Sequence, residues 1–204
     1  MTKAARIGLL GGTFDPPHIA HLAIARAALD ALALDEVRFI VAAQPWQKKD
    51  VSDAAHRVAM VKLAIADEPR FTLDTRELAR AGPSYTIDTL QEIRASEGGE
   101  AVLVLILGSD QYRNLPSWHR HAELDRYADI AVAHRGGDEL AAALPSVAPL
   151  VQPYGQHVMF TMPELHVSAS MIRTMLRRGE TPQALVSPCV LTYIRSHHLY
   201  TAPE

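Results

Sequence analysis

The chain has 204 residues, a formal net charge of -3 and 48% hydrophobic residues, a composition that predicts one domain with its own core. The small negative charge argues against a broad surface for DNA or RNA. No apolar stretch approaches the roughly 20 residues of a membrane span. The single cysteine, Cys189, excludes disulfide frameworks and cysteine-based zinc sites, and it indicates a reducing cytoplasm.

Short apolar runs alternate along the chain with stretches that carry apolar side chains at helical spacing. In chain order, we predict a strand at 6–10, a helix at 17–32, a strand at 37–42, a helix at 52–66, a strand at 71–73, a helix at 87–96, strands at 101–107 and 129–133, a short helix at 137–144, a Pro-rich loop at 145–153, a strand at 157–162 and helices at 168–178 and 181–197.

The run at 101–107, AVLVLIL, is apolar at nearly every position, which is typical of a central parallel strand buried on both faces. The alternation of strands and helices predicts an α/β fold, a Rossmann-like doubly wound parallel sheet with flanking helices. Ligands of such sheets bind beyond the carboxyl ends of the strands. We therefore expect the chemistry in the segments that directly follow the strands.

The segment 11–21, GGTFDPPHIAH, follows the first predicted strand and opens the first helix. Gly11 and Gly12 let a ligand approach the backbone closely, and Asp15 is predicted to cap the helix. A helix N-terminus offers free N–H groups and a positive dipole end, which together predict an anion site. His18 and His21 share a helix face there. Two satisfied core histidines are the alternative, because the same face carries apolar side chains.

This segment lacks the G-x-G-x-x-G fingerprint and the G-K-[ST] of a P-loop. It resembles instead the G-G-T-F-D-P-x-H-x-x-H signature of the nucleotidylyltransferase superfamily. The segment 167–173, VSASMIR, resembles the I-S-S-T-x-I-R motif of the same superfamily, although serines at a helix start are by themselves usually caps. The two resemblances imply that ATP is bound by Gly11, Gly12, Thr13, Phe14, His18, His21, Ser168, Ser170 and Arg173.

Three further segments resemble nicotinate-nucleotide adenylyltransferases in particular. They are SYTIDTL at 84–90, Gly-Ser-Asp at 108–110 and the tryptophan at 118, and the whole resemblance spans residues 6–197. Taken singly, they read as a helix cap at Thr86, an exposed turn at Asp110 and a packed aromatic at Trp118. The resemblance implies that Asp110 contacts both nucleotides and that the pyridine nucleotide contacts Thr86, Asp110, Trp118 and His119.

One segment departs from the pattern of these relatives. Many carry P-P-H-K near the second strand, whereas this chain has P-W-Q-K-K at 45–49. The histidine is missing, so Lys48 and Lys49 both stay candidates for the phosphate cation, with a solvated lysine pair as the alternative. The expected catalytic residues are therefore His18, His21, Lys48 and Arg173.

The resemblance implies adenylyl transfer from ATP to nicotinate mononucleotide, giving nicotinate adenine dinucleotide and pyrophosphate. We expect a single nucleotidylyltransferase domain over 1–204, whose C-terminal helices (about 168–198) complete the ATP site. Mg²⁺ is expected with ATP, held chiefly by phosphate oxygens, and no metal site of the chain's own is predicted. The expected partners are the two substrates, without nucleic acid polymer or membrane, and homo-oligomerisation is left open.

Other activities fit parts of this pattern. An adenylyltransferase for phosphopantetheine shares the two phosphate motifs but lacks S-Y-T-x-D-T-L, and a cytidylyltransferase fits less well. A nucleotide sensor without turnover could use the same fold. An NAD-linked dehydrogenase is disfavoured by the missing dinucleotide fingerprint.

Overall fold

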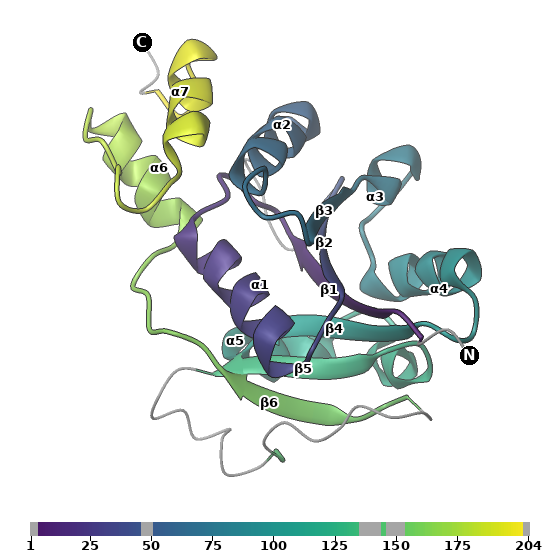
Figure 1. The fold of residues 1–204 in the computed structure, drawn as a ribbon. Helices are drawn as coiled ribbons and strands as arrows, with labels where there is room; N and C mark the ends of the chain where they lie inside the picture. Colours follow the sequence, from purple (N-terminus) through teal and green to yellow (C-terminus); the bar gives the residue numbers. More distant parts are fainter. Residues whose placement is uncertain (1–3, 46–50, 135–143, 146–153, 202–204) are drawn as a thin grey trace.

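The computed structural model describes residues 4–45, 51–134, 144–145 and 154–201 (Figure 1). Strands and helices alternate along these ranges. The elements are β1 (Arg6–Gly12), α1 (Ile19–Ala31), β2 (Glu36–Val41), α2 (Ala54–Ala64), β3 (Phe71–Asp74), α3 (Arg76–Ala79), α4 (Thr86–Glu97), β4 (Val102–Gly108), α5 (Ser109–Asn114), η1 (Leu115–Ser117), η2 (His121–Arg126), β5 (Asp129–His134), β6 (His157–Thr161), α6 (Ala169–Arg177) and α7 (Pro188–Ser196).

The six strands form one sheet in the order β3-β2-β1-β4-β5-β6, and every neighbouring pair is parallel. This is the doubly wound Rossmann order, so the predicted fold class is confirmed. The order reverses between β1 and β4, which are neighbours in the sheet. Ligands of such sheets bind at this reversal, beyond the carboxyl ends of the two strands.

Helices cover both faces of the sheet, and the strands supply apolar side chains to each face in alternation. Val104 and Ile106 of β4 join the core under α1 and α2. Leu103 and Leu105 join the core under α4 on the opposite face. The strand is buried at every position from 102 to 107, as its continuous apolar sequence predicts.

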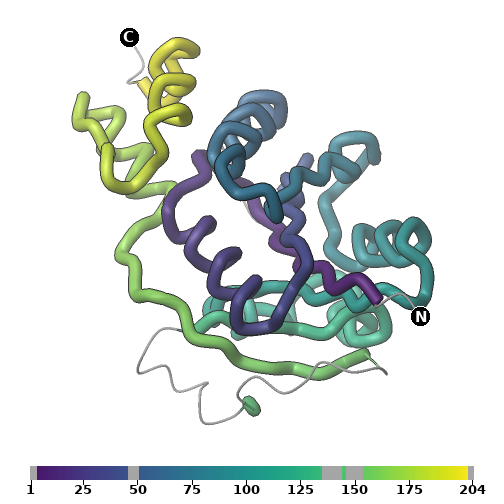
Figure 2. The backbone as a smooth tube through the Cα atoms, viewed as in Figure 1, coloured from purple at the N-terminus to yellow at the C-terminus, as the bar shows by residue number. Residues whose placement is uncertain are grey.

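The two C-terminal helices build a smaller core of their own beside α2. Ile172 of α6 and Ile194 of α7 pack there with Met60, which α2 supplies. Figures 1 and 2 show the chain running from β6 to this pair, which lies at the end of the molecule where α1 begins. The backbone N–H of Ile19 donates to the carbonyl of Leu185 at 3.0 Å, which ties the start of α1 to the turn before α7.

The first helix starts later than predicted, and its cap is His18 rather than Asp15. Asp15 and Pro16 each precede a proline, and a following proline disfavours helical backbone angles. His18 is itself extended, with φ -144° and ψ 172°, so α1 starts only at Ile19. The carboxylate of Asp15 is thereby available for contacts outside the helix.

The last helix is also shorter than the predicted 181–197, because α7 starts at Pro188. Proline has no N–H and suits the first helical position, where Ser187 caps the helix by accepting from Val190 N at 3.4 Å. The short helices α3 and α5 were not predicted, because so few residues show no periodicity. The predicted helix at 137–144 and loop at 145–153 lie almost entirely outside the described residues.

Candidate active site

The loop between β1 and α1 is buried and tightly turned. Phe14 has a positive φ of 52° and is only 2% exposed, and such backbone is uncommon in a bulky residue. A Cβ on Gly12 would lie 2.8 Å from the Phe14 ring. Glycine at this position therefore lets the aromatic ring fold back against the end of β1.

His18 and His21 stand together at the start of α1. Their ring centroids are 3.8 Å apart, and the edge of Phe14 meets His21 at 4.9 Å. The backbone N–H of His18 donates to Nδ1 of His21 at 3.1 Å. A nitrogen that accepts this bond carries no hydrogen, so a neutral His21 holds its proton on Nε2. His21 thus has a capping role besides any contact with a ligand.

Asp15 is the meeting point of three distant segments, and it is only 3% exposed. Arg173 Nη1 of α6 donates to the Asp15 carbonyl at 2.7 Å. The carboxylate accepts from Tyr200 Oη at 2.5 Å and from Ser52 N at 3.1 Å. The two segments that resemble phosphate motifs are therefore in direct contact.

Tyr200 lies just after α7 and is not part of any motif in the sequence. Burial, with the hydrogen bond to the negative Asp15 as the second cause, raises the pKa of Tyr200 far above its usual range. The hydroxyl therefore stays protonated and donates to Asp15 over the whole physiological pH range.

At the start of α6, Ser168 has the capping role that is usual for serine. Its Oγ accepts from Met171 N at 3.2 Å and lies 3.0 Å from Oγ of Ser170. Both serines are exposed, and Arg173 follows one turn later in the same helix. The N-terminus of α6 thus presents two hydroxyls, a guanidinium and a positive dipole end.

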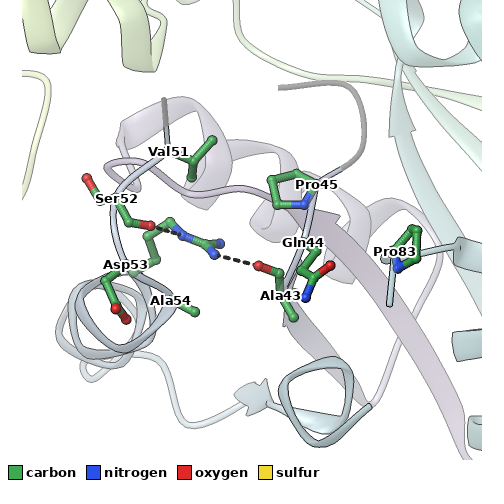
Figure 3. A pocket seen from close by; sticks show the side chains of 9 residues that line it. Ala43, Gln44, Pro45, Val51, Ser52, Asp53, Ala54 and Pro83 are labelled. Carbon is green, nitrogen blue, oxygen red and sulfur yellow. Dashed lines mark hydrogen bonds between the residues drawn. The ribbon is translucent and has the colours of Figure 1, made fainter. Parts of the chain in front are cut away.

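A cavity of about 430 Å³ lies between the β2–α2 connection and Pro83 (Figure 3). It opens at the carboxyl end of β2, where a doubly wound sheet binds its ligands. Its lining residues are Ala43, Gln44, Pro45, Val51, Ser52, Asp53, Ala54, Arg57 and Pro83. Lys48, the predicted phosphate cation, lies outside the described residues, as does Lys49.

Arg57 lines this cavity from α2 and is 1% exposed. Its guanidinium donates to the carbonyls of Ala42 at 2.6 Å, Ser52 at 2.9 Å, and Thr13 and Ala43 at 3.1 Å. Burial lowers the pKa of Arg57, while the nearby charge of Asp15 acts to raise it. Arginine keeps its charge under such shifts because its ordinary pKa is so high.

The predicted pyridine-binding residues follow β3 and β4. Thr86 is the first residue of α4, whose cap is Tyr85, so Thr86 does not itself cap the helix. Asp110 belongs to α5 rather than to a turn, and its side chain is 92% exposed. Trp118 packs against the core under α4, and its Nε1 is buried with no hydrogen-bond partner among the described residues.

Two further contacts connect this half of the site, one to the cavity and one between the segments after β3 and β4. Gln44 exchanges hydrogen bonds with Ser84, through its N–H to Ser84 Oγ at 3.2 Å and through its carbonyl to Ser84 N at 3.1 Å. The ring of Tyr85 stacks on His119 with centroids 4.3 Å apart. The segments that follow β1, β2, β3 and β4 are thus linked into one site at the switch point of the sheet.

Arg57 and Tyr200 are the members of this site that sequence reasoning missed. Arg57 falls on the buried stripe of α2 with Met60 and Val61, so a charged residue on an apolar helix face was the available signal. Tyr200 offers no such signal, because only the three-dimensional structure brings it to Asp15.

A parallel sheet in Rossmann order, in which the helix start after β1 contacts a second helix start at α6, is typical of nucleotide-binding α/β proteins. Residues 9–175 match the cytidylyltransferase-like family. Across the described residues, no helix is both long and apolar enough to span a bilayer.

The chain is 44% identical to the probable nicotinate-nucleotide adenylyltransferase of Chromobacterium violaceum, over 96% of this chain and 99% of that protein. It is 44% identical to the protein of the same name from Methylibium petroleiphilum, over 98% and 94%. The chain belongs to the nicotinate-nucleotide adenylyltransferase family. The nicotinic acid mononucleotide adenylyltransferase of Plasmodium falciparum, complexed with NaAD, has the same fold, with a TM-score of 0.79 at 19% identity over 96% of this chain and 97% of that one.

Proposed function

We propose that this chain transfers the adenylyl group of ATP to the phosphate of nicotinate mononucleotide, giving nicotinate adenine dinucleotide and pyrophosphate. The observation that carries the proposal is the bond from Arg173 to Asp15, which joins the two phosphate motifs across 158 positions of sequence. The family to which the chain belongs supports the same reaction. We infer from this contact that the C-terminal helices complete the ATP site of a single domain.

The reaction needs no general base to create its nucleophile. The attacking group is a phosphate monoester, whose second pKa is about 6, so it is largely a dianion at neutral pH. The difficulty is to bring two anions together and to stabilise the charge on the departing pyrophosphate. Catalysis then consists mainly of positioning and electrostatic stabilisation, with direct in-line transfer.

Each candidate residue has a defined part in this scheme. His18 and the N–H groups of the loop 11–14 hold the ATP phosphates at the start of α1. Arg173 and the hydroxyls at the start of α6 hold the β- and γ-phosphates. A guanidinium has five N–H donors, so one bond to Asp15 leaves others for phosphate oxygens. Lys48 is the proposed further cation.

Mg²⁺ is the expected metal, and it would neutralise phosphate charge during transfer. Within the described residues, no three His, Cys, Asp or Glu side chains gather into a metal site. The Asp15 carboxylate is already engaged by Tyr200 and Ser52. A site with so few available carboxylates fits a Mg²⁺ ion that enters with ATP and is held mainly by phosphate oxygens and water.

The acceptor site should prefer nicotinate over nicotinamide. In this proposal, backbone N–H groups around Thr86 and His119 converge on the acceptor's carboxylate, and Trp118 lies against its ring. A carboxylate only accepts hydrogen bonds, whereas a carboxamide would turn its NH₂ toward one of these donors. A buried donor without a partner costs about 1–3 kcal/mol, so the carboxamide form should react more slowly.

The test is pyrophosphate release from ATP with nicotinate mononucleotide, nicotinamide mononucleotide and phosphopantetheine as acceptors. We expect kcat/KM for the nicotinate form to be at least about tens of times higher than for the nicotinamide form. Competition between the two forms, resolved by mass, measures the selectivity directly. Transfer to phosphopantetheine alone, or binding without pyrophosphate release, would contradict the proposal. Because the single cysteine fits a reducing compartment, we propose the cytoplasm as its location.

A further inference from the structure

Arg57 connects two loops that are far apart in the sequence. Thr13 belongs to the loop after β1, whereas Ala42, Ala43 and Ser52 belong to the connection between β2 and α2. The carbonyls of all four residues accept from the same guanidinium. The dashed lines in Figure 3 end on Ser52 and Ala43, which lie on either side of the guanidinium and both line the cavity. One side chain thus fixes the backbone on two sides of the cavity.

These bonds also determine where the N–H groups of the loops point. The carbonyl of one residue and the N–H of the next belong to one planar trans peptide and point in opposite directions. Because the Thr13 carbonyl is directed at Arg57, the N–H of Phe14 is directed away from it. The same reasoning turns the N–H of Ala43 away, since the Ala42 carbonyl is directed at Arg57.

A loop that binds phosphate has to hide its carbonyl oxygens, because they carry partial negative charge and repel the anion. We propose that Arg57 is a positioning residue, which collects the carbonyls of both loops and thereby keeps these loops able to bind phosphate. The proposal rests on the proposed function, because that function assigns the ATP phosphates to the loop 11–14, which contains Thr13 and Phe14. Arg57 acts through the backbone that it holds.

The branched, planar guanidinium of arginine is essential to this role. Arg57 reaches carbonyls through Nε, Nη1 and Nη2, which lie in one plane and point in different directions. Lysine keeps the positive charge but has one nitrogen at the end of its side chain, so it cannot hold four separated carbonyls. Arg57→Lys therefore separates the effect of geometry from the effect of charge.

Arg94 provides a matched control at the opposite end of the sheet. It donates to the carbonyls of Ala101 and Tyr127 at 2.6 Å and of Gly98 at 3.2 Å. Ala101 and Tyr127 precede β4 and β5, so these carbonyls lie at the amino ends of the strands, away from the site. Arg94→Lys removes the same kind of interaction without touching the loops.

The experiment measures the binding of inorganic pyrophosphate with Mg²⁺ by titration calorimetry, together with thermal unfolding, for both variants. We expect Arg57→Lys to weaken pyrophosphate binding by about tenfold or more, and Arg94→Lys to leave it within about twofold of wild type. Binding by Arg57→Lys equal to wild type would overturn the proposal. Equal losses of binding in the two variants would do the same.

Pyrophosphate binding needs no acceptor, so this test separates the inference from the proposed function. A wild-type protein that binds pyrophosphate but releases none from ATP would contradict the function and leave the Arg57 comparison valid. If Arg57→Lys fails to fold, Arg57→Gln and Arg94→Gln replace the pair. If neither Arg57 variant folds while both Arg94 variants do, Arg57 is required for folding and the proposal is wrong.

Discussion

His18 caps α1 with its backbone in an extended conformation, and its ring lies against that of His21. We predict that His18→Ala lowers kcat by about 10²–10³, because it removes one stabiliser of the charge that develops on the phosphates. The variant should keep its fold. Steady-state kinetics and circular dichroism measure the two effects.

The control for His18 is His157→Ala. His157 lies at the start of the edge strand β6, where it bonds to Tyr112 at 2.8 Å and Asp125 at 2.9 Å. We expect this change to lower the melting temperature and to leave kcat near the wild-type value. Full activity of His18→Ala, or its failure to fold, would instead support a core role for the histidine pair.

Arg173 combines two tasks, because it holds the Asp15 carbonyl and is the expected phosphate ligand. We predict that Arg173→Lys recovers only part of the activity that Arg173→Ala loses, since an ammonium cannot hold two oxygens with the geometry of a guanidinium. The measurement is kcat and KM with varied ATP, and Arg177→Ala, an exposed change in the same helix, is the control. Equal activity of Arg173→Lys and wild type would exclude bidentate binding.

At the scale of single elements, the segment after α5 presents Trp118 next to the His119 that stacks on Tyr85. We predict that Trp118→Ala raises KM for nicotinate mononucleotide more than KM for ATP, because the aromatic face is lost. Stacking on a base is worth about 1–3 kcal/mol, and the pyridine ring is smaller. Trp118→Phe should recover most of the loss. A rise in KM for ATP alone would place Trp118 in the adenine pocket or in the core.

The sequence predicted those helices and strands whose apolar pattern extends over enough residues to show its spacing. All six strands fall within a few residues of their predicted positions, because apolar runs mark most of them, as in β4, which is apolar and buried from 102 to 107. The first helix begins after two consecutive prolines, and the last begins at Pro188. In both, backbone restrictions at proline outweighed the periodicity from which the helices were predicted.

For the site, motifs and the ends of strands identified His18, Arg173 and Trp118 as candidates, whose roles stay predictions. Its internal connections were not predictable in this way. Asp15 resembled a helix cap, whereas the structure shows its carboxylate receiving bonds from Ser52 and Tyr200. Such contacts depend on how α2 and α7 pack, which no local pattern contains.

At the scale of the whole molecule, the hydrogen bond from Tyr200 to Asp15 links the end of the described chain to the loop after β1. A hydrogen bond to a charged group is worth about 1.5–3 kcal/mol, so we predict that Tyr200→Phe loses stability of this size at pH 7. The raised pKa of Tyr200 means that this stability is complete below the usual tyrosine pKa of about 10. It declines as pH rises above that value, because the unfolded chain then releases the proton more readily.

Urea unfolding of wild type and Tyr200→Phe between pH 7 and about pH 11 tests this prediction. The difference in unfolding free energy should be constant up to about pH 10 and then shrink. Tyr193→Phe is the control, since it removes another tyrosine hydroxyl near the C-terminal helices, one that bonds His56 of α2 at 3.0 Å. A Tyr200→Phe difference that grows with alkaline pH would contradict the assignment.

The bond between Tyr200 and Asp15 has a consequence for how the protein is made. A nascent chain that has emerged as far as β6 contains every strand of the sheet, so the sheet can form during synthesis. It still lacks Arg173 and Tyr200, which reach back to Asp15 only after α6 and α7 have formed. The loop after β1 therefore reaches its full set of contacts only after the strands have been synthesised, because Asp15 depends on two residues that follow the sheet in the chain.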